Sequence, residues 1–200
     1  MTSTDAPTSD VAAEKAALRK AALAARAALG EDERRAAALA VAELGAELVA
    51  REKPARVSLF ISVKGEIDMA PLAERLAALG VSLCLPVIAA KAAPLVFRDW
   101  RPGDALEDKP FGLKEPPASV AEVAPDLLFV PLAAFDGDGG RIGYGGGFYD
   151  RTLEKLRAEG AALAVGVAFA AQEISRAPVE VHDQPLDYVL TETGLRSLGA

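Results

Sequence analysis

The chain has 200 residues, of which 51% are hydrophobic and 26% charged, the composition of an ordinary globular protein. Its 29 acidic and 22 basic residues leave a net charge of −7, which argues against a dedicated binder of nucleic acid or of anionic membranes. Cys84 is the only cysteine, so an intrachain disulfide is excluded, and no apolar stretch reaches the roughly 18 residues of a membrane span.

The N-terminal quarter of the chain is predicted to be a tail followed by two helices. Residues 1–9 are rich in Ser, Thr and Pro, which predicts a disordered tail. They lack the basic and apolar regions of a secretory signal, so we expect a cytoplasmic protein. An alanine-rich helix is predicted from its N-cap Asp10 to about Leu29, and a second helix from Glu31 to Arg51.

From Pro54 onward, short apolar runs alternate with helical patterns. Strands are predicted over residues 56–62, 81–87, 94–100, 127–135, 162–170 and 187–192. Helices are predicted over residues 69–80 and 148–160, and the five prolines of residues 101–125 predict a loop. This alternation indicates an α/β fold with a mainly parallel sheet flanked by helices. We therefore expect a single α/β domain over residues 10–200, with a helical arm (10–53) and a sheet core (54–200).

A glycine-rich segment, RIGYGGGFYD (141–150), follows a predicted buried strand and precedes a predicted helix. In that position, backbone N–H groups and the helix N-terminus present partial positive charge to a phosphate. The segment lacks the Gly-Lys-Ser/Thr of a Walker A loop and the spacing of a Rossmann fingerprint. Ligands of parallel sheets gather at the carboxyl ends of strands, so the loops after residues 62, 135 and 170 are the expected site. A surface loop without a ligand is the alternative interpretation.

Two kinds of charged residue accompany this segment. Asp150 falls in the first turn of the helix, where it either caps the helix or holds Mg²⁺ beside a bound polyphosphate. Either Asp183 or Asp187, which border the last predicted strand, is the second acidic candidate. Lys15 and Arg19 lie four residues apart on one helical face. They form either a solvated basic stripe or, if the arm packs over the glycine loop, a phosphate clamp.

Glu66 follows the first predicted strand in a glycine turn. It is interpreted either as a solvated loop charge or as an acceptor that orients a substrate. His182 is the only histidine, so a Ser-His-Asp or Cys-His mechanism would have to use it.

Taken together, these segments resemble the 5-formyltetrahydrofolate cyclo-ligases (5,10-methenyltetrahydrofolate synthetases). The resemblance rests on K-x-x-x-R at Lys15 and Arg19, GEID at 65–68, FGLKEP at 111–116, RIGYGGGFYDR at 141–151 and PVEVHDQPLDYVLTE at 178–192. These motifs occur in the family's order along nearly the whole chain. The glycine signature is specific by itself.

The resemblance implies an enzyme that uses ATP and Mg²⁺ to convert 5-formyltetrahydrofolate into 5,10-methenyltetrahydrofolate, with release of ADP and phosphate. ATP phosphorylates the formyl oxygen, N10 of the folate attacks the activated carbon, and phosphate leaves as the ring closes. The implied fold is similar to the CoA-transferase and ribose-5-phosphate-isomerase group. The implied partners are small molecules, reduced folate and ATP, with no nucleic acid and no membrane, and we expect a monomer.

Site residues carried over by the resemblance fall into four sets. The ATP site would contain Lys15, Arg19, Arg141, Ile142, Gly143, Tyr144, Gly145, Gly146, Gly147, Phe148 and Tyr149. The folate would contact Arg19, Ile61, Glu66, Phe111, Tyr144, Gly145, Gly146, Gly147 and Phe148. Arg141 and Tyr149 would be catalytic, and Asp150 and Asp183 would hold Mg²⁺.

The glycine run departs from some family members, which carry a basic residue where this chain has Tyr144 or Gly146. Arg141 is then the only cation within the loop. Two rival interpretations remain at this point. One is a related enzyme that acts on another N-formyl or carboxyl compound, and the other is a nucleotide-binding regulatory module without turnover.

Overall fold

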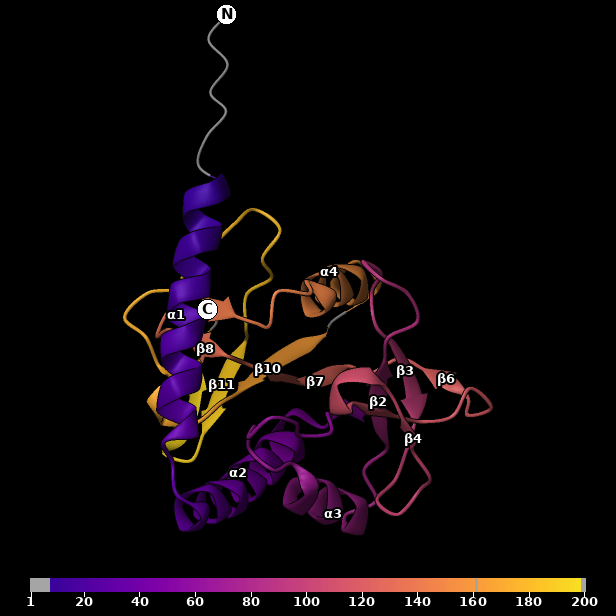
Figure 1. The fold of residues 1–200 in the computed structure, drawn as a ribbon. Coiled ribbons are helices and arrows are strands. Elements are labelled where there is room, and N and C mark those ends of the chain that lie inside the picture. Colours follow the sequence, from indigo (N-terminus) through magenta and orange to yellow (C-terminus); the bar gives the residue numbers. More distant parts are fainter. Residues whose placement is uncertain (1–7, 161, 199–200) are drawn as a thin grey trace, which may run out of the picture.

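The computed structural model of the protein describes residues 8–160 and 162–198 (Figure 1). Most of the predicted tail, residues 1–9, lies outside this range. Helix α1 (Thr8–Ala27) begins before the predicted N-cap Asp10, which lies instead in the first turn. It ends before Leu29 because the N–H of Leu29 bonds Arg26 O, three residues back, and the last turn tightens. Helix α2 (Glu31–Glu52) follows as predicted.

The core is an eight-stranded mixed sheet in the order β12-β11-β10-β7-β1-β2-β3-β6. Strands β11, β10, β7, β1 and β2 are parallel, and β12, β3 and β6 run antiparallel to their neighbours at the two edges. The strands are β1 (Val57–Ser58), β2 (Leu83–Val87), β3 (Val96–Asp99), β6 (Glu122–Val123), β7 (Leu127–Pro131), β10 (Leu163–Val167), β11 (Tyr188–Thr191) and β12 (Gly194–Ser197). The predicted mainly parallel sheet flanked by helices is confirmed.

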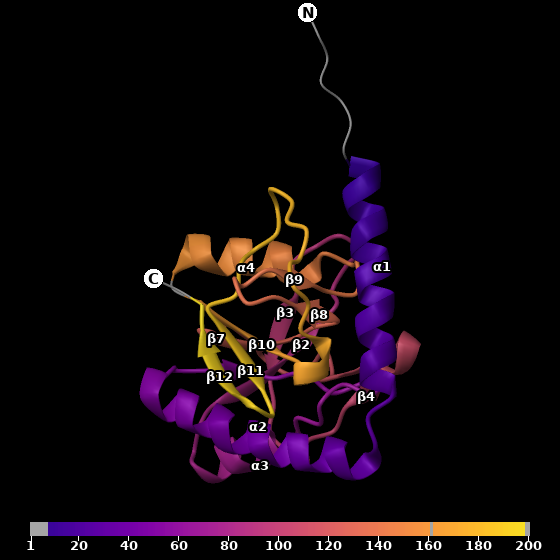
Figure 2. The ribbon, with the colours of Figure 1, turned by 90° about the vertical axis from the view of Figure 1, so that its left-hand side faces the viewer.

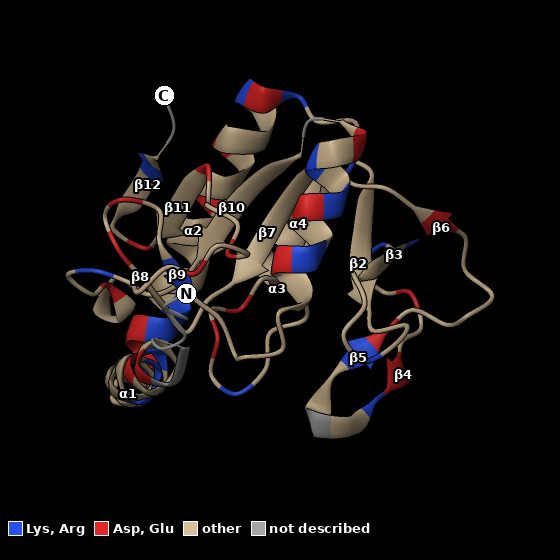
Figure 3. Cartoon of the chain, turned by 90° about the horizontal axis from the view of Figure 1, so that it is seen from above, with Lys and Arg blue, Asp and Glu red and all other residues tan. Residues whose placement is uncertain are grey.

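Helices cover both faces of the sheet, with α2 and α3 (Ala70–Ala78) on one side and α4 (Phe148–Glu159) on the other (Figure 1). Strand β7 shows why both faces are buried, because successive side chains of a strand point to opposite faces. Leu127 and Phe129 belong to the cluster under α2 and α3, and Leu128 and Val130 to the cluster under α4. Seen from above, β7 and β10 carry no charged residues, whereas α1 and α4 carry both signs (Figure 3).

Helix α1 stands beside the sheet rather than on either face (Figure 2). Its buried residue Ala22 joins a small cluster with Ala134, Ile142 and Ala177. This places the helix against the segments that follow β7 and β10. No helix within the described residues is both long and apolar enough to cross a membrane. The division of the chain into tail, arm and core stays a prediction.

Several predicted boundaries differ from the structure. Of residues 56–62, only Val57 and Ser58 pair as a strand, and residues 127–135 divide into β7 and β8 (Ala134–Phe135). An apolar pattern indicates which side chains are buried and not which main-chain groups are hydrogen-bonded, so the pattern can continue after the ladder of hydrogen bonds has ended. The short elements missed are β4 (Glu107–Asp108), the 3-10 helix η1 (Pro110–Gly112), β5 (Lys114–Glu115), β6, β9 (Arg141–Ile142), the 3-10 helix η2 (Ala170–Gln172) and β12.

Candidate active site

The glycine loop, residues 143–147, joins the β8–β9 hairpin to the N-terminus of α4. Gly145 and Gly147 have φ angles of 89° and 62°, in the left-handed region that favours glycine. Gly147 is the N-cap of α4, so the free N–H groups of the first helical turn open onto the loop. The loop thus lies at the N-terminus of a helix, where main-chain N–H groups without intrahelical partners are available to an anion.

The space around these glycines differs from one to the next. A Cβ at Gly147 would lie 2.7 Å from Arg151 Nη1, and one at Gly146 would lie 2.8 Å from the ring of Phe148. Arg151 also donates to Gly146 O at 2.7 Å, which holds the loop to the helix. A Cβ at Gly143 would meet no described atom within 4 Å. A side chain at Gly146 or Gly147 would therefore have to displace the Phe148 ring or the Arg151 guanidinium, whereas Gly143 has open space beside its main chain.

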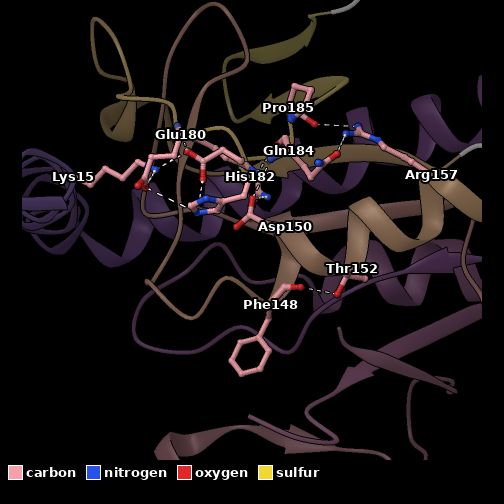
Figure 4. A network of polar contacts seen from close by, with 11 residues as sticks. Lys15, Phe148, Asp150, Thr152, Arg157, Glu180, His182, Gln184 and Pro185 are labelled. Atoms are coloured by element: carbon pink, nitrogen blue, oxygen red, sulfur yellow. Dashed lines mark hydrogen bonds and ion pairs between the residues drawn. The ribbon is translucent and has the colours of Figure 1, made fainter. Parts of the chain in front are cut away.

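Helix α1 packs over the glycine loop, as the predicted phosphate clamp requires. Arg19 Nε donates to Gly143 O at 2.7 Å. Lys15 Nζ lies 2.8 Å from Glu180 Oε2 and 2.5 Å from Asp183 Oδ2 (Figure 4). The side chain of Lys15 is only 12% exposed, so the pair is not a solvated stripe.

Lys15 ties the segment after β10 to α1 by charge. Burial lowers the pKa of Lys15, but the hydrogen bonds and charges of Asp183 and Glu180 outweigh burial and raise the pKa above its usual value. Lys15 is therefore charged at neutral pH. Asp183 Oδ2 also accepts the N–H of Glu180 at 2.9 Å, which stabilises the turn that carries both acids.

Arg141 and Asp150 form a second cation–carboxylate pair. Arg141 Nη2 lies 2.5 Å from Asp150 Oδ1, and the N–H of Gln184 donates to the same oxygen at 3.1 Å. Arg141 Nε in turn donates to Gln184 O at 3.0 Å. Burial lowers the pKa of Arg141, and the charge of Asp150 opposes this. Because Gln184 follows Asp183 directly, the two pairs belong to adjoining parts of one network.

The structure separates the two acidic candidates near the last parallel strand. Asp187 Oδ2 accepts Arg157 Nη2 at 2.8 Å and the N–H of Ala164 at 2.7 Å, so this carboxylate anchors α4 to the sheet. Arg157 also donates to Pro185 O at 3.0 Å (Figure 4). Asp183 instead lies beside Lys15 and next to the partner of Asp150. Of the two, Asp183 is the candidate metal ligand.

The acidic groups suit a hard cation such as Mg²⁺, which binds one or two carboxylates together with phosphate oxygens and waters. Glu180, His182 and Asp183 each bring one possible ligand atom within 4.8 Å of the others. Asp150 and Asp183 fit Mg²⁺ by donor chemistry. The exposed His182 imidazole is a ligand for softer metals and is not needed for that set.

Glu66 is half-buried in the turn after β1, and its Oε2 accepts the N–H of Val63 at 2.9 Å. Burial raises the pKa of the Glu66 carboxyl, while the Tyr144 hydroxyl, the Val63 N–H and the charges of Arg26 and Lys64 oppose that rise. Glu66 is therefore not a solvated loop charge. Its turn lies against the glycine loop.

The remaining predicted residues lie in different surroundings. Ile61 follows β1 and lines a cavity of about 300 Å³ with Ser62 and Trp100, and no described residue of the glycine loop borders this cavity. Burial raises the pKa of Tyr149, so its hydroxyl keeps its proton at neutral pH. Phe111 lies in η1, but its side chain is outside the part of the chain that the structure describes.

Three residues at the site were missed by reasoning from the sequence. Arg26 follows Lys15 by 11 residues, a spacing of about three helical turns that returns to the same face and was available as a signal. Arg151 holds the glycine loop through Gly146, so Arg141 is not the only cation that acts on it. Gln184 contributes its main chain, which no pattern of side chains reveals.

Comparison with known sequences gives one consistent family. A sequence model described as the 5-formyltetrahydrofolate cyclo-ligase family matches residues 11–192. The 5-formyltetrahydrofolate cyclo-ligase of Escherichia coli K12 is 39% identical over 140 residues, which cover 68% of this chain and 76% of that protein. The protein of the same name from Haemophilus influenzae is 34% identical over 148 residues, covering 72% of this chain and 79% of its own.

Solved structures give the same result for the fold. The structure of 5,10-methenyltetrahydrofolate synthetase from Aquifex aeolicus superposes with a TM-score of 0.77 at 31% identity, over 93% of each chain. A 5,10-methenyltetrahydrofolate synthetase from Mycoplasma pneumoniae superposes with a TM-score of 0.71 at 22% identity, over 89% of this chain and 98% of that one. At that identity, the second likeness supports the fold alone.

Proposed function

The chain belongs to the 5-formyltetrahydrofolate cyclo-ligase family and converts 5-formyltetrahydrofolate into 5,10-methenyltetrahydrofolate, and we propose that it does so with ATP and Mg²⁺, through a phosphorylated formyl oxygen. ADP and phosphate are the other products. A formyl amide is a poor electrophile, and phosphorylation turns its oxygen into a leaving group.

The observation that carries the proposal is the arrangement of two cation–carboxylate pairs around a glycine loop. Lys15 pairs with Asp183 and Arg141 with Asp150, and both pairs involve the segment that holds Gln184. A polyphosphate would bind the two cations, and a divalent cation would bind the two carboxylates. The four side chains thus balance one another's charge in this structure, and they would balance the charges of a bound nucleotide and its metal.

The phosphoryl donor would occupy the loop end of the site. The open main chain at Gly143 and the free N–H groups at the start of α4 would bind phosphate oxygens. Lys15, Arg19 and Arg141 would add charge-assisted contacts. Phosphoryl transfer requires positioning and charge stabilisation rather than a nucleophilic side chain. The main chain of Ile142, Tyr144 and Gly145 through Phe148 would complete the proposed nucleotide contacts.

Ring closure follows from the same geometry. The γ-phosphoryl group moves to the formyl oxygen as ADP leaves, and the N10 lone pair attacks the formyl carbon. N10 then loses its proton to solvent, and the C–O bond breaks as phosphate leaves. Arg141 would stabilise charge on the transferred group, and the protonated Tyr149 hydroxyl would donate a hydrogen bond to it. When bound by Asp150 and Asp183, Mg²⁺ would neutralise the phosphate charge.

The folate would lie between the glycine loop and the turn after β1. Glu66 would accept an N–H of the folate, and Ile61 would contact its apolar surface. Arg19 and residues 144–148 would face both substrates, and Phe111 is proposed to stack on the pterin. A cytoplasmic location and a monomeric state also remain proposals.

An absorbance assay tests the proposal. Purified protein is incubated with 5-formyltetrahydrofolate, ATP and Mg²⁺, and the near-UV band of methenyltetrahydrofolate is followed. We expect the band to rise only when ATP and Mg²⁺ are both present, and to stay flat with EDTA or without ATP. Product formation without ATP would overturn the phosphorylation step. ATP binding without any folate-dependent release of ADP would favour a regulatory nucleotide-binding module.

A further inference from the structure

Arg26 is a buried cation on α1 to which neither the family motifs nor the proposed mechanism gives a role. It is 4% exposed, and its acceptors come from two segments far away in the sequence. Nη1 donates to the Tyr144 hydroxyl at 2.8 Å, and Nη2 donates to Lys64 O at 2.8 Å. The guanidinium also lies over the Tyr144 ring, 5.9 Å from its centroid. One side chain thus joins α1, the glycine loop and the turn after β1.

The turn that carries Glu66 needs such support. Lys64 and Gly65 have φ angles of 52° and 79°, and a left-handed conformation at a non-glycine residue persists only where its surroundings hold it. Arg26 binds the carbonyl of Lys64, and Arg34 of α2 binds the carbonyl of Gly65 at 2.8 Å. Arg34 also donates to Arg26 O, so the two arginines that bind the turn are hydrogen-bonded to each other.

The Tyr144 hydroxyl, which Arg26 binds, also affects the pKa of Glu66. A phenol has one proton to donate, and an incoming N–H from Arg26 occupies an acceptor position of its oxygen. The Tyr144 hydroxyl lowers the pKa of the Glu66 carboxyl against the opposing effect of burial. Arg26 therefore links the Tyr144 side chain to the turn that carries Glu66 through two hydrogen bonds.

The position of Arg26 along α1 indicates which substrate it affects. Lys15 contacts the 180–183 segment, and Arg19 contacts the loop main chain at Gly143. Arg26, two turns beyond Arg19, contacts the side chain of Tyr144 and the turn of Glu66. The first two cations thus lie toward the proposed phosphate end, and the third lies toward the proposed folate end.

We propose that Arg26 is a positioning residue for the folate half of the site, which fixes Tyr144 and Glu66 relative to each other. This inference rests on the proposed placement of folate between these two residues. Arg26 acts through them and does not touch the reacting atoms. Its hydrogen-bond acceptors are a hydroxyl and a carbonyl, so replacement by an apolar side chain breaks no ion pair among the described residues, although it removes a positive charge that lowers the pKa of Glu66.

The test uses Arg26→Met, Tyr144→Phe and the double variant. For each we would measure kcat, KM for 5-formyltetrahydrofolate, KM for ATP and the melting temperature. A calorimetric Kd for 5-formyltetrahydrofolate without ATP adds a readout that needs no turnover. For Arg26→Met we expect the folate KM and Kd to rise about tenfold, with the ATP KM within about twofold of wild type. The double variant should be no worse than the weaker-binding single variant, because both changes remove the same hydrogen bond between Arg26 and Tyr144.

Two further variants separate positioning from general support of the fold. Arg26→Lys keeps a charge and fewer donors, so it should recover part of the folate affinity. Arg75→Met removes an exposed arginine of α3 that pairs with Glu43, and it should change none of the kinetic constants.

An equal rise in both KM values, an additive double variant, or unchanged folate affinity in Arg26→Met would overturn the inference. Loss of ATP-dependent turnover in the wild type would instead refute the proposed function. The calorimetric comparison would still decide the role of Arg26 in that case.

Discussion

The charged side chains at the site form cation–carboxylate pairs, so each carboxylate contributes to stability as well as to the proposed metal site. Asp150 neutralises the buried Arg141, and Asp183 neutralises Lys15. A buried ion that loses its partner is costly, so these pairs keep the site intact before any ligand arrives. The same carboxylates are the groups that a divalent cation would take.

Replacement of Asp150 by Asn distinguishes its contribution to stability from its proposed binding of Mg²⁺. The amide keeps the shape of the side chain and can accept the N–H of Gln184, but it leaves Arg141 without a counter-charge. We expect the free energy of unfolding to fall by about 1–3 kcal/mol and Mg²⁺-dependent turnover to fall at least about 100-fold. Asp187→Asn is the matched control, since Asp187 pairs with Arg157 away from the loop. It should cost similar stability and little turnover, and equal turnover losses in both variants would assign Asp150 a purely structural role.

The raised pKa of Glu66 predicts that the stability of the protein depends on pH. Burial raises its folded-state pKa, so the folded protein prefers the protonated carboxyl. The stability from that preference is complete below the unfolded pKa, about 4.3, and is lost as pH rises through the folded pKa. Glu66→Gln should therefore unfold at higher urea concentration than wild type at pH 8, with a smaller difference at pH 4. Its folate affinity should fall about tenfold. A variant less stable than wild type at pH 8 would contradict burial as the cause.

At the scale of elements, the glycine loop contains glycines of two kinds. Gly147→Ala forces a left-handed conformation and displaces Arg151, so it should destabilise the protein by about 1–2 kcal/mol. Gly143→Ala meets open space, so its stability should stay near that of wild type. If phosphate approaches the main chain there, the ATP KM of Gly143→Ala should nevertheless rise. Thermal unfolding together with ATP kinetics distinguishes these effects, and an unchanged KM in Gly143→Ala would place the phosphate elsewhere.

Elements with a strong local signal were predicted well, and those that depend on a partner were not. Helix α4 begins at Phe148 as predicted, because glycines precede it and its apolar face recurs at helical spacing. Strand β9 lies inside the glycine segment and forms only because β8 pairs with it. Strand β1 retains two of the seven residues predicted as a strand (56–62), since its neighbours β2 and β7 pair with it only there.

At the scale of the whole molecule, α1 brings Lys15 and Arg19 to the glycine loop and the 180–183 segment. Removal of residues 1–9 spares every described side-chain contact of the site, so we expect kcat/KM to stay within about twofold of wild type. Removal of residues 1–20 deletes Lys15 and Arg19 and should abolish measurable turnover. The near-UV assay with circular dichroism as a check on folding compares the two. A large loss in the shorter truncation would refute the assignment of these residues to a dispensable tail.

The parallel sheet explains why distant segments form one site. Strands β1, β7 and β10 are neighbours, so the turn after β1, the glycine loop and the 178–184 segment leave the same region of the sheet. Strand order could not be predicted, because the periodicity of a run says which face is buried and not which strand lies beside it.

By itself, the sequence determined the α/β class, most helices, the glycine loop and the residues that match the family motifs. These depend on local periodicity, on glycine conformations and on identities at fixed spacing, all of which are written in adjacent residues. Only the tertiary structure assigned Asp187 to Arg157 and Asp183 to Lys15, and only it brought Arg26 to Tyr144. Such pairs join residues up to 168 positions apart, and their energy exists only once the sheet has brought the segments within hydrogen-bonding distance.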